Sequence, residues 1–157
     1  MANIAIRKAR EDEGEVLTAL SMRAKQSNGY DDAFMARCRD ELAVTATRLA
    51  ADEYWVAESD RVCGCASLSV RADGKTAQIH SFFVEPDFHG MGVGKMLWSK
   101  LRGRAEALSL DSLCLDADPN AEPFYIKMGF SRIGEVASGS IAGRTIPHMK
   151  LDLKVVQ

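Results

Sequence analysis

The apolar residues of this chain recur with two different spacings, which indicates a mixture of helices and strands. Spacings of three and four residues predict helices over residues 11–27, 32 to about 50, the stretch between Gly94 and Leu108, and 121–128. Short apolar or alternating runs predict strands over residues 4–7, 54–58, 62–70, 79–84, 113–115, 130–136 and 146–153.

The order of these elements predicts an α+β fold with a mixed sheet. From the N-terminus it is β-α-α-β-β-β-α-β-α-β-β, and no linker, repeat or low-complexity segment interrupts it. Asp73-Gly74 is a strong hairpin signal, so the strands on either side of it should be antiparallel. A helix connects strand 79–84 to strand 113–115, so these two should be parallel. The chain has 157 residues, of which 46% are hydrophobic, and this suits a single domain over residues 1–157.

Charge and composition narrow the possible functions. The net charge is −2 with no basic stripe, so the electrostatic signature of nucleic-acid binding is missing. No apolar run is long enough to cross a membrane, and the first residues lack the apolar core of a signal peptide. We therefore expect a cytoplasmic protein, in which Cys38, Cys63, Cys65 and Cys114 are reduced thiols. Their spacing matches no metal-binding pattern, so we expect no metal site.

Three alternate glycines, Gly90, Gly92 and Gly94, lie between strand 79–84 and the helix that follows it. Alternate glycines allow the backbone to approach a ligand closely and can turn several N–H groups in one direction. The start of the helix adds unpaired N–H groups and the positive end of the helix dipole. This order of elements predicts a main-chain cradle for a diphosphate.

Two common diphosphate motifs do not fit this loop. The dinucleotide fingerprint requires a third glycine at the position that Lys95 occupies. The nucleotide P-loop requires a glycine and a Ser or Thr at the positions of His89 and Met96. What remains is the pattern V-x-P-x-x-x-G-x-G-x-G over residues 84–94.

A second pattern, N-x-x-x-x-Y-x-x-x-G-F, extends from Asn120 to Phe130 and includes Tyr125. Together the two patterns make the chain resemble the GNAT family, the GCN5-related N-acyltransferases. The acyl-CoA motif of that family would lie on residues 89–94, with His89 in place of the usual Gln or Arg. Asn120 is in addition a good N-cap for the helix predicted over residues 121–128.

The resemblance implies a fold and a reaction. The fold would be a central mixed, mostly antiparallel sheet flanked by helices, with a V-shaped split between its two middle parallel strands. The reaction would transfer an acetyl group from acetyl-CoA to a primary amine, with Tyr125 protonating the leaving thiolate, since a phenol is a suitable acid. The residues that would hold acetyl-CoA are the main chain of Phe83 and Val84, the loop residues His89, Gly90, Met91, Gly92, Val93 and Gly94, Lys95 near the phosphates, and Asn120.

Several residues are candidates for the general base and for contacts to the acceptor. Asp116 follows strand 113–115 beside the cradle and is the first candidate for the base, although a solvated loop carboxylate is the alternative. His80 could face the acceptor, or it could be a structural residue of its strand. Tyr30 and Arg144 lie in segments that would line the acceptor side, where Tyr30 could receive a cationic amine and Arg144 a carboxylate. The acceptor could be a small molecule or the N-terminus or a lysine of a protein.

Two other functions are compatible with this sequence. One is an acyl-CoA-binding domain that regulates a partner without turnover, against which Tyr125 argues. The other is an unrelated phosphate- or nucleotide-binding enzyme, against which the incomplete P-loop argues. We expect direct transfer rather than a covalent cysteine intermediate, because Cys114 has no histidine beside it in the sequence. Exposed strand edges would also allow a homodimer.

Overall fold

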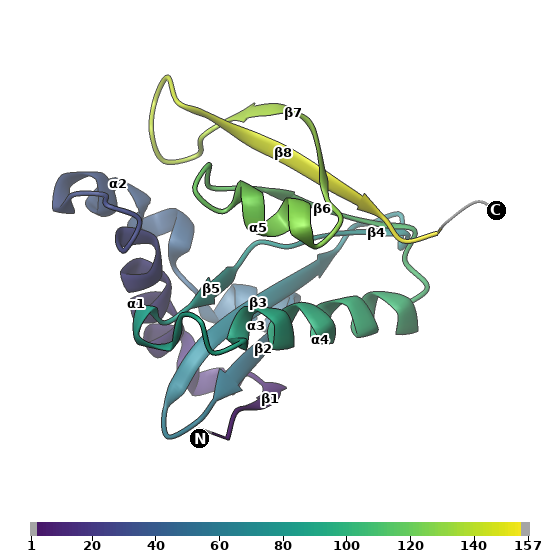
Figure 1. Ribbon diagram of the computed structural model, residues 1–157, viewed down its shortest axis with the longest axis horizontal. Helices are drawn as coiled ribbons and strands as arrows, with labels where there is room; N and C mark the ends of the chain where they lie inside the picture. The colour runs from purple at the N-terminus through teal and green to yellow at the C-terminus, as the bar shows by residue number, and fades with distance from the viewer. Residues whose placement is uncertain (1–2, 155–157) are drawn as a thin grey trace.

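The computed structural model describes residues 3–154, in which eight strands form a sheet with helices packed on both faces (Figure 1). The strands are β1 (Ala5–Lys8), β2 (Glu53–Glu58), β3 (Val62–Val70), β4 (Thr76–Gln78), β5 (Phe82–Val84), β6 (Ser112–Asp116), β7 (Ser131–Ala137) and β8 (Thr145–Asp152). The helices are α1 (Gly14–Gln26), α2 (Asp32–Leu42), α3 (Ala46–Ala51), α4 (Val93–Ala107) and α5 (Glu122–Lys127). No helix in this part of the chain is both long enough and apolar enough to span a bilayer.

The sheet is mixed and mostly antiparallel. Its order is β1-β2-β3-β4-β6-β8-β7, with β5 paired to β3 beside β4. Among the strands of residues 3–154, only β4 and β6 are parallel, and α4 lies between them in the chain. The predicted α+β fold is therefore confirmed. The parallel neighbour expected for strand 79–84 belongs instead to β4, which ends just before those residues.

The single strand predicted over residues 79–84 is wrong, because the chain changes partner within it. The Ile79 N–H donates to the Cys114 carbonyl at 2.9 Å, on the β6 side. Two residues later the Ser81 carbonyl accepts from the Ser67 N–H at 2.9 Å, on the β3 side. The chain thus forms β4 before the break and β5 after it, and β5 moves away from β6. Within residues 3–154, β5 pairs with β3 alone, so one edge of β5 stays open at a V-shaped split.

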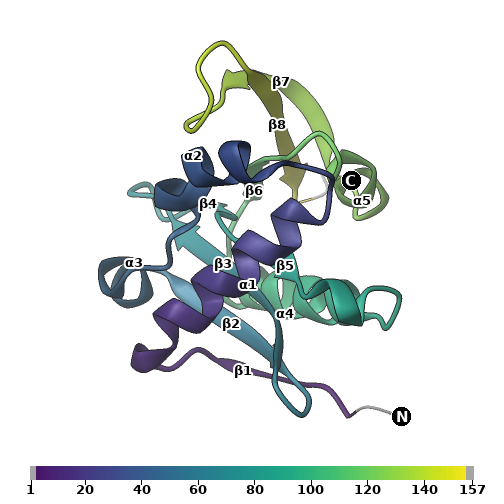
Figure 2. The same ribbon diagram turned by 90° about the vertical axis from the view of Figure 1, so that its left-hand side faces the viewer.

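Helices cover the two faces of the sheet (Figure 2). On one face, Leu17 and Leu20 of α1 are fully buried against Tyr54 and Val56 of β2. On the opposite face, α4 buries Leu97, Trp98, Leu101 and Ala105, which recur at helical spacing. Leu108 continues that spacing in the sequence but is the C-cap of α4 and is exposed. Tyr125 of α5 belongs to this second cluster.

Two helix boundaries differ from the prediction. The helix expected from residue 32 to about 50 is two helices, because Ala43 is extended and Thr45 begins α3 by accepting from the Arg48 N–H at 3.2 Å. The last helix begins at Glu122 with Ala121 as its N-cap, so the assignment of Asn120 as the cap is wrong. The Asn120 amide is instead engaged by other side chains, described below.

Ion pairs fix both ends of α1 to the sheet. At its start, Arg7 of β1 binds Glu13 through two hydrogen bonds of 2.8 Å and also binds Glu58 of β2 at 3.2 Å. At its end, Arg23 binds Glu85 through two hydrogen bonds of 2.8 and 2.7 Å. Glu85 directly follows β5 and is only 3% exposed, so this pair also fixes the end of β5. No local pattern of residues predicts that this carboxylate is buried.

Candidate active site

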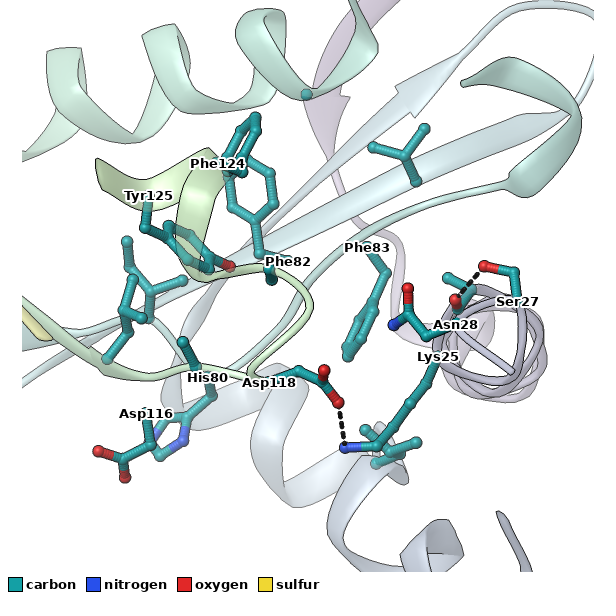
Figure 3. A pocket seen from close by; sticks show the side chains of 18 of the residues that line it. Lys25, Ser27, Asn28, His80, Phe82, Phe83, Asp116, Asp118, Phe124 and Tyr125 are labelled. Carbon is teal, nitrogen blue, oxygen red and sulfur yellow. Dashed lines mark hydrogen bonds and ion pairs between the residues drawn. The ribbon is translucent and has the colours of Figure 1, made fainter. Parts of the chain in front are cut away.

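A cavity of about 610 Å³ lies where β5 and β6 separate. Its walls come from β5, the glycine loop, the end of β6, α5, the end of α1 and the segment between β7 and β8 (Figure 3). Segments that are far apart in the sequence therefore share one concave surface, which is typical of a small-molecule site.

The glycine loop has the main-chain conformation that a cradle requires. Gly90 and Gly92 have φ angles of 80° and 81°, in the left-handed region that favours glycine. Gly92 is the N-cap of α4, and the N–H groups of the first turn of a helix have no partner within that helix. The His89 ring turns back toward β5, where its Nε2 lies 3.3 Å from the Val84 carbonyl oxygen.

The register of β5 decides which of its main-chain groups face the cavity. Ser81 and Glu85 both pair with β3 through main-chain hydrogen bonds of 2.9 and 2.8 Å. Hydrogen-bonded pairs alternate along an antiparallel ladder, so Phe83 also directs its N–H and carbonyl toward β3, opposite Cys65. The main-chain groups of Phe82 and Val84 therefore point toward the open edge.

Tyr125 lies on α5 with its ring among three aromatic rings, and its hydroxyl points into the cavity (Figure 3). The ring centroids of Phe82, Phe124 and Phe130 lie 6.0, 5.3 and 5.7 Å away. The residue is 7% exposed. Burial, and to a lesser degree the negative charge of Asp118, raises the pKa of Tyr125 above its usual value. The phenol therefore keeps its proton at neutral pH and has that proton available to donate.

Asp116 and His80 lie together on the other side of the cavity. Asp116 ends β6, and its Oδ1 lies 2.6 Å from Nδ1 of His148, the residue opposite it on β8. His80 is in the break between β4 and β5 and lines the same cavity. The site thus holds a carboxylate oriented by an imidazole, with a second imidazole beside it.

A polar cluster forms part of the wall next to α5. The Asp118 carboxylate accepts from the Tyr30 hydroxyl at 2.8 Å and from the Asn120 amide at 2.9 Å. Lys25 and Arg144 lie 3.6 and 3.8 Å from the same carboxylate. Arg144 also donates to the Tyr30 hydroxyl at 2.7 Å. Arg144 and Tyr30, predicted separately as acceptor contacts, are therefore bound to each other.

Most residues predicted for the site line the cavity. They are Tyr125 and Asp116, His80 and Arg144, Phe83 and Val84, and His89, Gly90, Gly92, Val93, Gly94 and Lys95. Among the residues that the structure describes, Met91, Asn120 and Tyr30 do not belong to this lining. Lys25, Glu41, Phe124 and Asp118 line it and were not predicted. The Asp-Pro turn signal at Asp118 could have drawn attention to that residue.

The four cysteines are buried and unbonded to one another. Burial raises the pKa of the thiols of Cys63 and Cys114, and it raises the pKa of Cys65 to about 12. None of the four lines the cavity within residues 3–154. At neutral pH the thiols of Cys63, Cys65 and Cys114 are protonated and poor nucleophiles.

The sequence matches the model of the acetyltransferase (GNAT) domain over residues 12–153. This chain belongs to the GNAT acetyltransferase family. A curated GNAT relative, the peptidyl-lysine N-acetyltransferase YjaB of Escherichia coli (strain K12), is 31% identical over 94% of this chain and 95% of its own length.

Solved GNAT structures have the same fold. A GCN5-related N-acetyltransferase from Rhodopseudomonas palustris superposes with a TM-score of 0.79 and 25% identity, covering 98% of both chains. The PaiA N-acetyltransferase of Thermoplasma acidophilum, solved in complex with coenzyme A, gives a TM-score of 0.76 and 17% identity, covering 96% of this chain and 99% of that one. The mixed sheet of this chain is therefore arranged as in solved GNAT acetyltransferases.

Proposed function

We propose that this GNAT chain transfers an acetyl group from acetyl-CoA to a primary amine in one direct step. The observation that carries the proposal is the position of Tyr125. Its protonated hydroxyl points into a cavity that joins the glycine loop at one end to Asp116 and His80 at the other. A proton donor between a diphosphate cradle and a candidate base is the arrangement that thioester aminolysis requires.

The proposed reaction is aminolysis of the thioester. The amine nitrogen attacks the thioester carbonyl carbon, so a C–N bond forms and the C–S bond breaks. The Val84 N–H, which points toward the open edge, would stabilise the developing oxyanion. Tyr125 would give its proton to the departing thiolate and regain one from solvent. Asp116 would accept the proton that the amine loses, while His148 orients its carboxylate at 2.6 Å.

The donor would be held largely by main-chain groups. We propose that the N–H groups of the loop over residues 89–95 and the first turn of α4 bind the diphosphate. The register of β5 favours Phe82 and Val84, rather than Phe83, as main-chain partners of the pantetheine arm. Phe83 would contribute its side chain to the cavity wall.

We propose that the acceptor amine is the side chain of a lysine in a peptide. The E. coli relative is named a peptidyl-lysine N-acetyltransferase, and the carboxylates of Asp116 and Glu41 at the cavity would attract a cationic amine. A small-molecule amine remains the second candidate for the same site.

Two measurements test the proposal. The first is thermal stability with acetyl-CoA, CoA, ATP or NADH, since a ligand at a hundred times its dissociation constant adds about 2.7 kcal/mol of stability. Stabilisation by acetyl-CoA and CoA alone is expected, whereas stabilisation by ATP or NADH alone would favour a nucleotide-binding enzyme. The second is release of free thiol from acetyl-CoA with a lysine-containing peptide or small amines. Donor binding without thiol release across that panel would favour a regulatory acyl-CoA-binding domain.

A further inference from the structure

We call Lys25, Tyr30, Asp118 and Arg144 together the acceptor-side wall. Asp118 is the residue of this wall that contacts the other three, which come from three separate segments. Tyr30 reaches it from the segment between α1 and α2, at 2.8 Å. Arg144 reaches it from the segment between β7 and β8, at 3.8 Å, and also donates to the Tyr30 hydroxyl at 2.7 Å. Lys25 reaches it from the last turn of α1, at 3.6 Å, as Figure 3 shows. No other carboxylate among residues 3–154 joins all three segments.

The local environment favours the ionised form of Asp118. Its side chain is 13% exposed, and burial alone would raise the pKa of the carboxyl group. Hydrogen bonds from the Asn120 main chain and amide and from the Tyr30 hydroxyl, together with the charge of Lys25, outweigh burial and lower the pKa of Asp118. A carboxylate with this many donors is held in one orientation, and it holds its donors in turn.

Aromatic packing reinforces the same contact. The Tyr30 ring stacks on Phe34 with a centroid distance of 4.1 Å, and the Arg144 guanidinium lies 5.3 and 5.1 Å from these two rings. Arg144 is thus held between a carboxylate and two aromatic faces. A second contact between these parts is the hydrogen bond from Ser140 to Glu41.

The wall held in this way borders the cavity beside Tyr125. Lys25, Asp118 and Arg144 all line the cavity. Asp118 also begins the turn into α5, because its carbonyl accepts from the Ala121 N–H at 2.8 Å. A shift of Asp118 would therefore change both the acceptor-side wall and the helix that carries the hydroxyl of Tyr125.

We propose that Asp118 is a positioning residue, which shapes the acceptor half of the site by tying Tyr30, Lys25 and Arg144 to the turn before α5. It touches neither the thioester nor the amine in this role. Only the kinetic consequence of this inference rests on the proposed acetyl transfer. The contacts of Asp118 with Tyr30, Lys25 and Arg144 are present in the free protein.

The first test measures, without any substrate, whether Asp118 holds these segments in place. Amide hydrogen exchange is compared for the wild type, Asp118→Asn, Tyr30→Phe and the control Asp152→Asn, whose carboxylate belongs to an exposed pair with Lys150 at the far end of β8. In Asp118→Asn, amide exchange should become about tenfold faster both in residues 27–32 and in residues 138–145. In Tyr30→Phe, exchange in the same two segments should become faster by a smaller factor. Unchanged exchange in either segment of a folded Asp118→Asn protein would overturn the proposal.

The second test separates positioning from chemistry. With a lysine-containing peptide as acceptor, Asp118→Asn should raise the acceptor KM about tenfold while the KM for acetyl-CoA stays within about twofold. A lower kcat with both KM values unchanged would show that Asp118 acts on the chemical step, directly or through α5 and Tyr125, and would overturn its role in shaping the acceptor half of the site. If the wild type acetylates neither the peptide nor a panel of amines, the proposed function fails. The exchange experiment then still decides whether Asp118 holds Tyr30, Lys25 and Arg144 in place.

Discussion

At the scale of single residues, burial keeps the hydroxyl of Tyr125 protonated. Because its pKa is raised, the phenol carries the proton across the neutral range and donates it as a weaker acid than an exposed tyrosine. The aromatic rings around it cause the shift, so the residues that fix the orientation of Tyr125 also set its protonation state.

Replacing Tyr125 by Phe should lower kcat by about a hundredfold or more, the usual size of a lost general acid. The ring and its packing remain, so stability and CoA binding should change little. Initial rates of thiol release and a CoA thermal shift check both parts. Because the pKa of Tyr125 is raised, wild-type kcat should show no loss from phenol ionisation up to about pH 10. A Tyr125→Phe enzyme with wild-type kcat would remove the acid role.

Gly94 shows why a small residue is needed where α4 meets α5. A Cβ atom at this position would lie 3.2 Å from Phe124 Cε1. Gly94→Val should therefore destabilise the protein by about 1–3 kcal/mol and weaken CoA binding, because Phe124 lines the cavity. The matched control is Gly103→Val in the same helix, where a Cβ meets no atom within 4 Å. Urea unfolding and CoA titration of both variants check this, and equal effects at the two positions would contradict it.

At the scale of elements, ion pairs at both ends of α1 decide where its last turn lies. The pair Arg7–Glu13 fixes its start to β1, and the pair Arg23–Glu85 fixes its end to the residue after β5. Lys25, which belongs to the acceptor-side wall, is in that last turn. The position of this wall therefore depends on contacts at the opposite end of the helix.

Glu13→Gln should lower the free energy of unfolding by about 3 kcal/mol at pH 7, since the pKa of Glu13 is lowered to about 2 by Arg7 and its side chain is 6% exposed. A carboxyl group with a lowered pKa stabilises the fold above its unfolded pKa, so the difference should shrink as the pH falls from about 4.5 to about 2. Urea unfolding at pH 7 and pH 3 measures it. Glu58→Gln removes the exposed partner of the same arginine and should cost much less.

Periodicity predicted the helices and most strands, because those elements are amphipathic on their own. It failed over residues 79–84, since the chain there changes hydrogen-bond partner from Cys114 to Ser67, and both are far away in the sequence. The cap prediction at Asn120, made from residue type, also failed: Ala121 is the N-cap, and the Asn120 amide donates instead to the Asp118 carboxylate and the Tyr30 hydroxyl. The glycine loop was predictable as a site because its spacing is local. The wall around Asp118 was not, because it joins three segments that no local pattern relates.

At the scale of the whole molecule, the split divides the sheet into two halves (Figure 1). The cavity lies between the strands that border the split. One half contains β1 to β3 and β5, and the other contains β6 to β8, with β4 joining the two. A ligand in the cavity would contact both halves, so its binding energy would stabilise their relative position as well as the local loops.

This arrangement predicts an alternating pattern of protection along β5. Addition of CoA should slow amide exchange at Phe82 and Val84, whose N–H groups face the cavity, and leave Phe83 unchanged because its N–H already pairs with β3. Residue-resolved exchange measured by NMR, with and without CoA, provides the check, and Phe83 serves as an internal control. Slowing at Phe83 alone would show that the register argument is wrong.

The open edge of β5 also bears on how this protein avoids self-association. Unpaired strand edges usually invite strands of other molecules and so promote aggregation. Here the unpaired groups of Phe82 and Val84 lie inside the V formed with β6, among the residues that line the cavity. Residues of β6, α5 and α1 line the same cavity and therefore stand between this edge and the edge of another sheet. The split that exposes the edge of β5 to a slender ligand thus shields it from other sheets.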